Sequence, residues 1–526
     1  MSAYDYVIVG AGSAGCVLAA RLSEDPGVRV AVIEAGGPDT AQEIHTPAAF
    51  PQLFKSDLDW DLNSDPEPGI GGRRAFLPRG KTFGGCSSMN AMIYIRGNRV
   101  DYDDWAAAGA KGWSYAEVLP YFRRAEDNQR GEDQLHGTGG PLTVSDGRSG
   151  HPLATAFVRA AEQAGHRAND DFNGATQFGV GRYQLTQRDG LRCSAAVAYL
   201  HPALDRPNLT VLPSTRAHRV VIEDGRATGV EVARAGNVES VRAEREVILS
   251  AGAYESPKLL MLSGIGPAAA LTAAGIDVLG ELPVGQGLQD HYATMLNFRT
   301  DAETLIDAAS SANAELLQRA GRGPLTSNLA EAGGFFRSRD ELAAPDLQFH
   351  ALAAPFHQEG LGPVTEPGFA FGPCVLTPTS RGAVTLRSAR PDAAPRIVHN
   401  YLTTAEDRAA VVAGIRIALE IAAQPAMADL ITGPYGDAPA SDSDAELLAW
   451  AQRAGQTLYH PTSTCAIGRV VDPELRVLDV AGLRVVDASV FPMVPRGNTN
   501  APVIMAAEKA ADLLKESNAR HVPERR

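Results

Sequence analysis

A histidine and an asparagine near the C-terminus are the residues of this chain best suited to catalysis. His460 lies in a Tyr-His-Pro tripeptide, and Asn498 follows further along in a Gly-Asn-Thr-Asn run. An imidazole accepts a proton near neutral pH because its ordinary pKa is about 6.5. A carboxamide can hold and orient an oxygen atom through hydrogen bonds. Removal of a hydroxyl proton needs a base of this kind, so we predict that both residues are catalytic.

A glycine-rich run near the N-terminus predicts a nucleotide site. Residues 4–9 are apolar and read as a strand, and residues 13–22 have the apolar spacing of a helix. In such a strand-turn-helix, Gly10 permits the tight turn, Gly12 lets the backbone approach a pyrophosphate, and Gly15 lets the helix pack closely on the strand. Free N–H groups at the helix N-terminus attract phosphate. The predicted phosphate cradle comprises Gly10, Gly12, Ser13, Ala14 and Gly15.

A carboxylate at the end of the next apolar run narrows the choice of nucleotide. Buried parallel strands read as continuous apolar runs, so residues 4–34 form a predicted βαβ unit that ends at Glu34. A carboxylate there accepts hydrogen bonds from ribose hydroxyls and repels a 2′-phosphate, which disfavours NADP. The pattern alone does not distinguish NAD from FAD. An NAD-linked dehydrogenase and a nucleotide-binding module without catalysis are therefore alternatives at this point.

The composition argues against several classes of partner. A chain of 526 residues with 44% hydrophobic and 21% charged residues is typical of a soluble globular protein with two large cores. The formal net charge of −14 disfavours nucleic acid and anionic membranes as partners. No apolar run approaches the ~20 residues of a membrane helix, and no signal peptide opens the chain. We expect a cytoplasmic protein without an integral membrane span, and leave peripheral membrane association and a homo-oligomer open.

The remaining segments supply the elements that must position these residues. Residues 39–79 form an irregular stretch, rich in Pro, Asp and Gly, which we interpret as a lid or cofactor cover. Five scattered cysteines without a C-x-x-C pair predict reduced thiols and no metal site. Asn500 is the predicted cap of the last helix, which leaves Asn498 free, and residues 516–526 are expected to fray. Further strands are predicted at 209–212, 246–250, 381–388 and 483–487, and further helices from Pro257, at 405–423 and at 502–515.

Three longer stretches resemble the signatures of one enzyme family. Residues 78–92, PRGKTFGGCSSMNAM, and 250–267, SAGAYESPKLLMLSGIGP, resemble the first and second signatures of the glucose-methanol-choline (GMC) flavin oxidoreductases. Residues 459–514 are similar to the catalytic segment of that family. The likeness is strongest to the choline-dehydrogenase-like and alcohol-dehydrogenase-like branch. It implies FAD as the cofactor, His460 as the active-site histidine and Asn498 as its partner.

The resemblance implies an α/β fold with an α+β substrate part. A Rossmann-like FAD-binding domain is expected to be discontinuous, with residues 1–149, 190–298 and 453–526. A substrate-binding domain of antiparallel sheet plus helices, residues 150–189 and 299–452, is expected to be inserted through its middle.

The resemblance also implies which residues contact FAD, many of them through the main chain. Met89 stands where some choline oxidases carry the histidine that links FAD covalently, and a methionine cannot form that link, so non-covalent FAD is expected. Ala217 is expected near the adenine, and Asp487 with Ala488 near the diphosphate and ribityl groups. Besides the phosphate cradle, the implied FAD contacts are Glu34, Ala35, Arg79, Thr82, Gly84, Gly85, Asn90, Ala91, Met92, Ala217, Ala251, Gly252, Asp487, Ala488, Asn498 and Thr499.

The substrate pocket is less well defined by the sequence. His350 and Glu331 match positions that face the substrate in choline-oxidising relatives, and a carboxylate opposite a quaternary ammonium makes electrostatic sense. The string around Glu331 also resembles non-choline members, so a structural ion pair is the alternative for this residue. Tyr459 and Trp60 are the aromatic candidates for pocket walls.

The implied activity is the FAD-dependent oxidation of a primary or secondary alcohol to an aldehyde or ketone. His460 assists removal of the hydroxyl proton, and the hydride passes to flavin N5. Oxygen, a quinone or another carrier then accepts the electrons. A choline-specific dehydrogenase or oxidase and a non-redox lyase on the same FAD scaffold are the alternatives.

Overall fold

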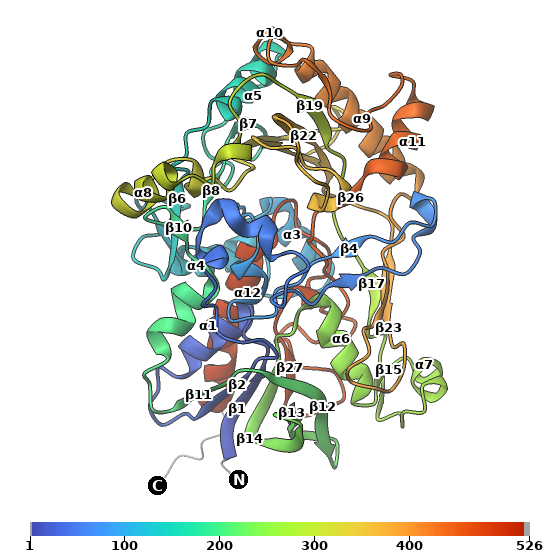
Figure 1. The fold of residues 1–526 in the computed structure, drawn as a ribbon. Coiled ribbons are helices and arrows are strands. Elements are labelled where there is room, and N and C mark those ends of the chain that lie inside the picture. Colours follow the sequence, from blue (N-terminus) through green and yellow to red (C-terminus); the bar gives the residue numbers. More distant parts are fainter. Residues whose placement is uncertain (1–2, 520–526) are drawn as a thin grey trace.

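A seven-stranded mixed sheet has the expected Rossmann-like arrangement at its centre. A computed structural model describes residues 3–519, and its lower part in Figure 1 is this sheet, with strand order β11-β2-β1-β14-β13-β12 and β27 against β14. Strand β1 pairs in parallel with β2 and β14, and β14 pairs in parallel with β27. Its strands are β1 (Ala3–Val9), β2 (Val30–Ile33), β11 (Leu209–Leu212), β12 (Thr215–Glu223), β13 (Arg226–Arg234), β14 (Asn237–Leu249) and β27 (Leu483–Val485).

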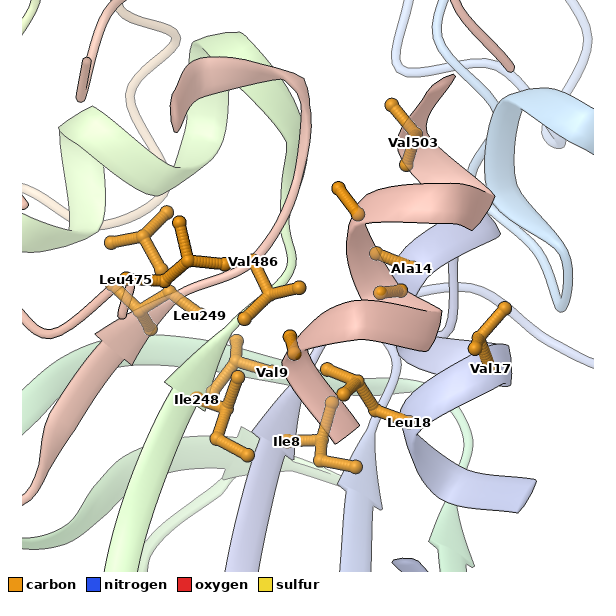
Figure 2. Close-up of a cluster of buried hydrophobic side chains, with 14 of the residues drawn as sticks. Ile8, Val9, Ala14, Val17, Leu18, Ile248, Leu249, Leu475, Val486 and Val503 are labelled. Atoms are coloured by element: carbon orange, nitrogen blue, oxygen red, sulfur yellow. The ribbon is translucent and has the colours of Figure 1, made fainter. Parts of the chain in front are cut away.

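Two helices from opposite ends of the chain pack together on this sheet. Helix α1 (Ser13–Leu22) follows the glycine turn, and α12 (Asn500–Ala519) packs against it. A methyl group at Gly15 would lie 1.8 Å from the carbonyl oxygen of Gly10, so the close approach of α1 to the turn requires a glycine there. Figure 2 shows buried apolar side chains of β1, β14, α1 and α12 gathered in one cluster, among them Ile8, Val9, Leu18, Ile248, Leu249 and Val503.

The second sheet is antiparallel and carries its helices on the outside. The strand order is β25-β19-β22-β21-β20-β7, with β18 paired to both β22 and β26. In Figure 1 α10 lies above this sheet, α5 lies to its left, and α9 and α11 lie to its right. Strands β18, β19 and β26 belong to it, although the expected boundaries place all of their residues except Arg299 with the FAD-binding domain. Its strands are β7 (Gly179–Arg182), β18 (Tyr292–Ala293), β19 (Leu296–Arg299), β20 (Ala332–Phe336), β21 (Leu347–Leu352), β22 (Gly368–Val375), β25 (Gly433–Pro434) and β26 (Gln456–Thr457).

Shorter elements connect the two sheets. The segment 39–79 is not wholly irregular, because it contains α2, β3 and β4. The other helices are α2 (Gln42–His45), α3 (Arg99–Ala107), α4 (Tyr115–Ala125), α5 (Pro152–Gln163), α6 (Gly252–Leu262), α7 (Ala268–Ala273), α8 (Ser311–Ala320), α9 (Ala405–Ala422), α10 (Pro425–Ala428) and α11 (Asp444–Ala454). The small strands are β3 (Leu62–Asn63), β4 (Phe76–Leu77), β5 (Glu126–Asn128), β6 (Leu142–Asp146), β8 (Gln184–Leu185), β9 (Gln187–Arg188), β10 (Leu191–Arg192), β15 (Ile265–Gly266), β16 (Gly280–Glu281), β17 (Gln286–Leu288), β23 (Gly382–Thr385) and β24 (Arg396–Val398).

Helix α6 begins before the proline that was predicted to open it. It starts at Gly252 and contains Pro257 in its interior. Proline has no N–H, so the carbonyl of Ala253 one turn earlier loses its helical donor. The hydroxyl of Thr464 donates to that carbonyl at 2.8 Å instead. A tertiary hydrogen bond therefore makes the interior proline tolerable.

The last helix also differs from its prediction. Asn500 is the first helical residue rather than the cap, and its side-chain oxygen accepts a hydrogen bond from the Ser13 hydroxyl at 2.7 Å. The side chain predicted to cap α12 thus ties α12 to α1. Residues 516–519 continue the helix instead of fraying, and residues 520–526 lie outside the described part of the chain.

Two structural features bear on the expected partners. Within residues 3–519, no helix is long and apolar enough to cross a membrane, and no group of three or more His, Cys, Asp or Glu side chains is arranged to hold a metal ion. Each of the five cysteines is a free thiol, and Cys465 is buried.

Candidate active site

One cavity brings the N-terminal glycine turn and the C-terminal His-Asn pair together. His460 and Asn498 line it together with residues of both sheets. Three of the predicted FAD contacts do not line the cavity: Gly15, Thr82 and Gly84. Gly84 contacts the glycine turn instead, since its N–H donates to the Ala11 carbonyl at 2.7 Å. The other predicted FAD contacts all line the cavity: Gly10, Gly12, Ser13, Ala14, Glu34, Ala35, Arg79, Gly85, Asn90, Ala91, Met92, Ala217, Ala251, Gly252, Asp487, Ala488, Asn498 and Thr499.

The glycine-turn end of the cavity fits a dinucleotide. A methyl group at Gly12 would meet only the Ser250 carbonyl oxygen, at 3.9 Å, so the space beside this glycine is open on the cavity side. The Ser250 hydroxyl is buried in the wall, and no residue from 3 to 519 offers it a hydrogen bond. The N-termini of α1 and α12 both reach the wall, through Ser13 and Thr499. Helix N-termini favour anionic groups, so this end is suited to a diphosphate.

The buried Glu34 carboxylate is held at the cavity wall. It accepts hydrogen bonds from the backbone N–H groups of Ala11, at 2.8 Å, and Gly36, at 2.7 Å. Burial raises the pKa of this carboxyl, and the N–H groups oppose the rise. These bonds leave lone pairs on both oxygens, because a carboxylate has about four acceptor positions. Glu34 is therefore placed to accept from ribose hydroxyls.

A chain of hydrogen bonds assigns the ring protons of His460. The Nε2 atom of His291 lies 3.2 Å from the Leu376 carbonyl, which can only accept, so His291 carries its proton on Nε2. Burial lowers the pKa of His291 to about 4, which keeps the ring neutral and its Nδ1 an acceptor. The Nδ1 atoms of His291 and His460 are 2.9 Å apart, so His460 is the donor in this contact. The neutral His460 ring therefore presents an unprotonated Nε2.

Asn498 is fixed from the other side. Its amide nitrogen lies 3.3 Å from Nε2 of His460, and its oxygen accepts from the side-chain nitrogen of Gln348 at 3.0 Å. Gln348 is itself oriented, because the same nitrogen donates to the Tyr183 hydroxyl, which donates to the Phe349 carbonyl. The N–H groups of Asn498 consequently lie beside the lone pair of His460. A hydroxyl group bound here can donate to Nε2 while its oxygen accepts from Asn498.

Asp290 holds the two histidines in place. One of its oxygens accepts the backbone N–H groups of His460, at 2.7 Å, and His291, at 2.9 Å. The other accepts the hydroxyls of Tyr401 and Thr457. Four donors offset the cost of burying this carboxylate. Sequence reasoning missed Asp290, His291 and Gln348; the only signal for the first two was a polar Gln-Asp-His run beside a short apolar strand.

The pKa of His460 fits the role of a base. Burial lowers it well below its ordinary range, and the neighbouring His291 and His350 lower it further. The ring is therefore neutral at physiological pH, with its lone pair available. Proton transfer to Nε2 requires a hydroxyl group held in hydrogen-bond contact with it.

Comparison with known proteins decides the family. Two models of the GMC oxidoreductase family match the chain, at residues 4–293 and 378–507. The chain belongs to the GMC oxidoreductase family. The sequence resemblance is thereby confirmed, and the protein is an oxidoreductase of the mixed α/β type.

Similar proteins cover nearly the whole of this GMC oxidoreductase. An uncharacterized GMC-type oxidoreductase of Mycobacterium tuberculosis is 46% identical over 97% of this chain and 99% of its own length. An oxygen-dependent choline dehydrogenase of Sinorhizobium fredii is 45% identical, and an alcohol dehydrogenase (acceptor) of Pseudomonas putida is 43% identical, each over 97% of this chain and 95% of the relative. Among solved structures, pyridoxine 4-oxidase from Mesorbium loti has a TM-score of 0.89 at 33% identity and covers 99% of this chain and 100% of that one. Formate oxidase from Aspergillus oryzae RIB40, a structure concerned with FAD modification, has a TM-score of 0.92 at 30% identity and covers 99% of each chain.

Three of the predicted pocket residues of this GMC oxidoreductase line the cavity. His350, on β21, is buried there, and among the described residues neither of its ring nitrogens has a hydrogen-bond partner. Burial lowers the pKa of His350 to about 3. Tyr459 lines the wall and donates its hydroxyl to the Glu359 carbonyl at 3.2 Å. Trp60 also lines it, but beside Arg216, the neighbour of the expected adenine contact Ala217.

Glu331 does not belong to the pocket, which corrects its assignment. Its buried carboxylate accepts the Ser327 hydroxyl at 2.6 Å and the His151 N–H at 3.1 Å, and lies 3.5 Å from Arg182. The residue is absent from the cavity wall. The alternative reading, a structural ion pair, is the one that the geometry favours.

Proposed function

We propose that this GMC oxidoreductase oxidises a primary or secondary alcohol to the aldehyde or ketone, with non-covalently bound FAD. One observation carries the proposal: the lone pair of His460 Nε2 and the amide N–H of Asn498 converge in a cavity that also contains a dinucleotide cradle. The names of the alcohol and choline dehydrogenases similar to this chain support an alcohol as substrate. The FAD-containing formate oxidase supports the choice of cofactor.

The residues that would hold FAD are those of the cavity wall. Glu34 would accept from the ribose, the N-termini of α1 and α12 would face anionic groups, and the loop around Gly85 and Asn90 would lie against the ring system. When bound, FAD supplies at N5 an acceptor for the hydride that leaves the carbinol carbon. Met89 lines the same wall, and its thioether cannot form a histidyl link, which supports non-covalent binding.

The protein residues then handle the proton and the oxygen. Nε2 of His460 accepts the hydroxyl proton, and the N–H of Asn498 donates to the oxygen as negative charge develops on it. The Nδ1–H of His460 already donates to His291, so the imidazolium that forms keeps an acceptor for its Nδ1–H. The balance is one alcohol giving a carbonyl product, a proton on His460 and a hydride on the cofactor.

Anaerobic mixing of the FAD-loaded protein with alcohols tests the proposal. We expect alcohols to bleach the flavin absorbance, and His460→Ala to slow bleaching by about 10²- to 10⁴-fold while leaving the FAD content unchanged. A variant that bleaches at a near-normal rate would show that His460 is not the base. A lyase on this scaffold would leave the flavin oxidised with every alcohol. Release of all the flavin by acid precipitation would establish non-covalent binding.

A further inference from the structure

The carboxylates in the cavity wall are all engaged by other groups. Among the described residues of the wall they are Glu34, Glu255 and Asp487. Glu34 accepts two backbone N–H groups, and Glu255 pairs with Lys258 at 3.0 Å. Asp487 accepts the Gly252 N–H at 2.9 Å together with two serine hydroxyls. All three therefore already have hydrogen-bond or ion-pair partners, and none is an isolated counter-ion for a cationic substrate.

The cavity wall also carries positive charge. Arg79 lines the cavity, and its guanidinium donates to the carbonyl of Tyr459 at 3.0 Å, next to His460. Burial works against the charged form of this guanidinium, but neighbouring groups that include Asp290 and Asp59 raise its pKa, and its positive charge lowers the pKa of His460. A second cation in the wall, Arg216, lies over the ring of Trp60 at 5.1 Å. A cation placed beside either guanidinium would be repelled by it.

Much of the remaining cavity wall is apolar. The apolar residues of this wall include Phe50, Met295, Leu352 and Phe356. They belong to one buried cluster with Met89 and Met92, which are in the loop around Gly85 and Asn90. Burial in such surroundings favours hydrocarbon and penalises an unpaired charge.

The aromatic rings are already used in packing. The ring of Phe54 meets those of Phe50, at 6.1 Å, and Tyr459, at 5.9 Å, edge to face. A cage for a quaternary ammonium needs ring faces directed at the ligand. Edge-to-face contacts among these rings occupy part of that surface.

From these features we infer that the substrate is a neutral alcohol with a hydrocarbon or aromatic body, and that choline and other cationic alcohols are excluded. The inference rests on the proposed function, since it concerns the alcohol bound at His460. The wall also contains two uncharged polar side chains, His350 and Asn328. Within the described chain, the ring nitrogens of His350 and the amide oxygen of Asn328 have no hydrogen-bond partner. A neutral hydrogen-bonding group on the substrate body is compatible with this wall.

A matched pair of alcohols tests the charge alone. Choline and 3,3-dimethylbutan-1-ol have the same shape, with a quaternary nitrogen in one and a quaternary carbon in the other. We expect anaerobic flavin reduction by the neutral alcohol to exceed that by choline at least about 100-fold in rate constant over Kd, because an unpaired charge is expensive to desolvate. Choline that reduces the flavin as well as the neutral alcohol, or better, would overturn the inference. If no neutral or cationic alcohol reduces the flavin, it is the proposed function that fails.

Binding and two variants provide readouts beyond turnover. Titration calorimetry on FAD-loaded His460→Ala is expected to detect 3,3-dimethylbutan-1-ol and not choline. Leu352→Glu, which places a carboxylate in the wall, is expected to shift the preference toward choline. Glu331→Gln, outside the cavity, is the matched control and is expected to leave the preference of the wild type unchanged. If Glu331→Gln lost binding or flavin reduction with only one of the two alcohols, the assignment of the pocket would be wrong.

Discussion

Replacement of His291 tests the assignment of the ring protons on His460. With the proton on Nε2 instead of Nδ1, His460 would face His291 with two lone pairs 2.9 Å apart and would lose their hydrogen bond. A buried polar group left without its partner costs about 1–3 kcal/mol. This energy corresponds to a preference of about five- to 150-fold for the tautomer with a free Nε2. The variant His291→Leu removes the acceptor and should remove that preference.

The matched control is His291→Asn, which has nearly the same size and shape as the leucine variant. Its side-chain oxygen can take the place of Nδ1 and accept from His460. We expect His291→Leu to reduce the flavin about five- to 150-fold more slowly than the wild type. The asparagine variant should recover most of that loss.

The assay is stopped-flow flavin reduction under nitrogen, with FAD content and thermal unfolding measured for each variant. A loss of transition-state stabilisation lowers the limiting rate and leaves the substrate Kd nearly unchanged. Equal rates for the leucine and asparagine variants would refute the role of the acceptor, since both remove the imidazole. A leucine variant as fast as the wild type would refute it as well.

Three further outcomes follow from the site and its surroundings. Because the pKa of His460 is lowered, the rate of flavin reduction at pH 6 should equal the rate at pH 8. An imidazole of ordinary pKa would be only about one quarter neutral at pH 6. A rate that falls by half between pH 8 and pH 6 would contradict the lowered pKa. The methyl group added in Gly15→Ala would lie 1.8 Å from the Gly10 carbonyl oxygen, so this variant should lower the melting temperature of the FAD-free protein. The methyl group added in Gly12→Ala meets only one atom, at 3.9 Å, so this variant should keep its stability and bind FAD more weakly in calorimetry. The reverse order of effects would be inconsistent with the cradle. Burial opposes protonation of His136, but hydrogen bonds to Asp171 and Glu126 raise its pKa from 6.5 to about 9. The charged imidazolium therefore contributes its full stabilisation below pH 6.5 and loses it as the pH rises through about 9. The melting temperature should therefore fall more between pH 7 and pH 9.5 in the wild type than in His136→Gln, and parallel curves would exclude this contribution.

Local patterns in the sequence predicted the first strand and helix well. The strand at 4–9 and the helix at 13–22 follow from apolar spacing and glycine geometry, and both lie where they were expected. The second strand of the βαβ unit, predicted at 28–34, extends only over 30–33, and β14 is longer than its predicted 246–250 because it forms a hairpin with β13. These differences arise from strand pairing, which residue spacing does not report.

The surroundings of the base could not be predicted in the same way. Asp290 and His291 reach His460 because β18 and β26, far apart in the sequence, pair in the second sheet. Gln348 reaches Asn498 from β21 of that sheet. Motif matching finds residues whose neighbours in the chain are distinctive. It misses those whose role depends on a partner in another strand, and for the same reason it misplaced Glu331.

The pairing of α1 with α12 has a consequence for how the protein is made. The hydroxyl of Ser13 bonds to Asn500, and β27 joins the sheet beside β14 (Figure 1). Strand β14 therefore lacks one of its neighbours, and helix α1 lacks its packing partner, until the ribosome has released almost the entire chain. FAD capture should accordingly be a late, post-translational event, and nascent chains halted before residue 480 should not retain the flavin.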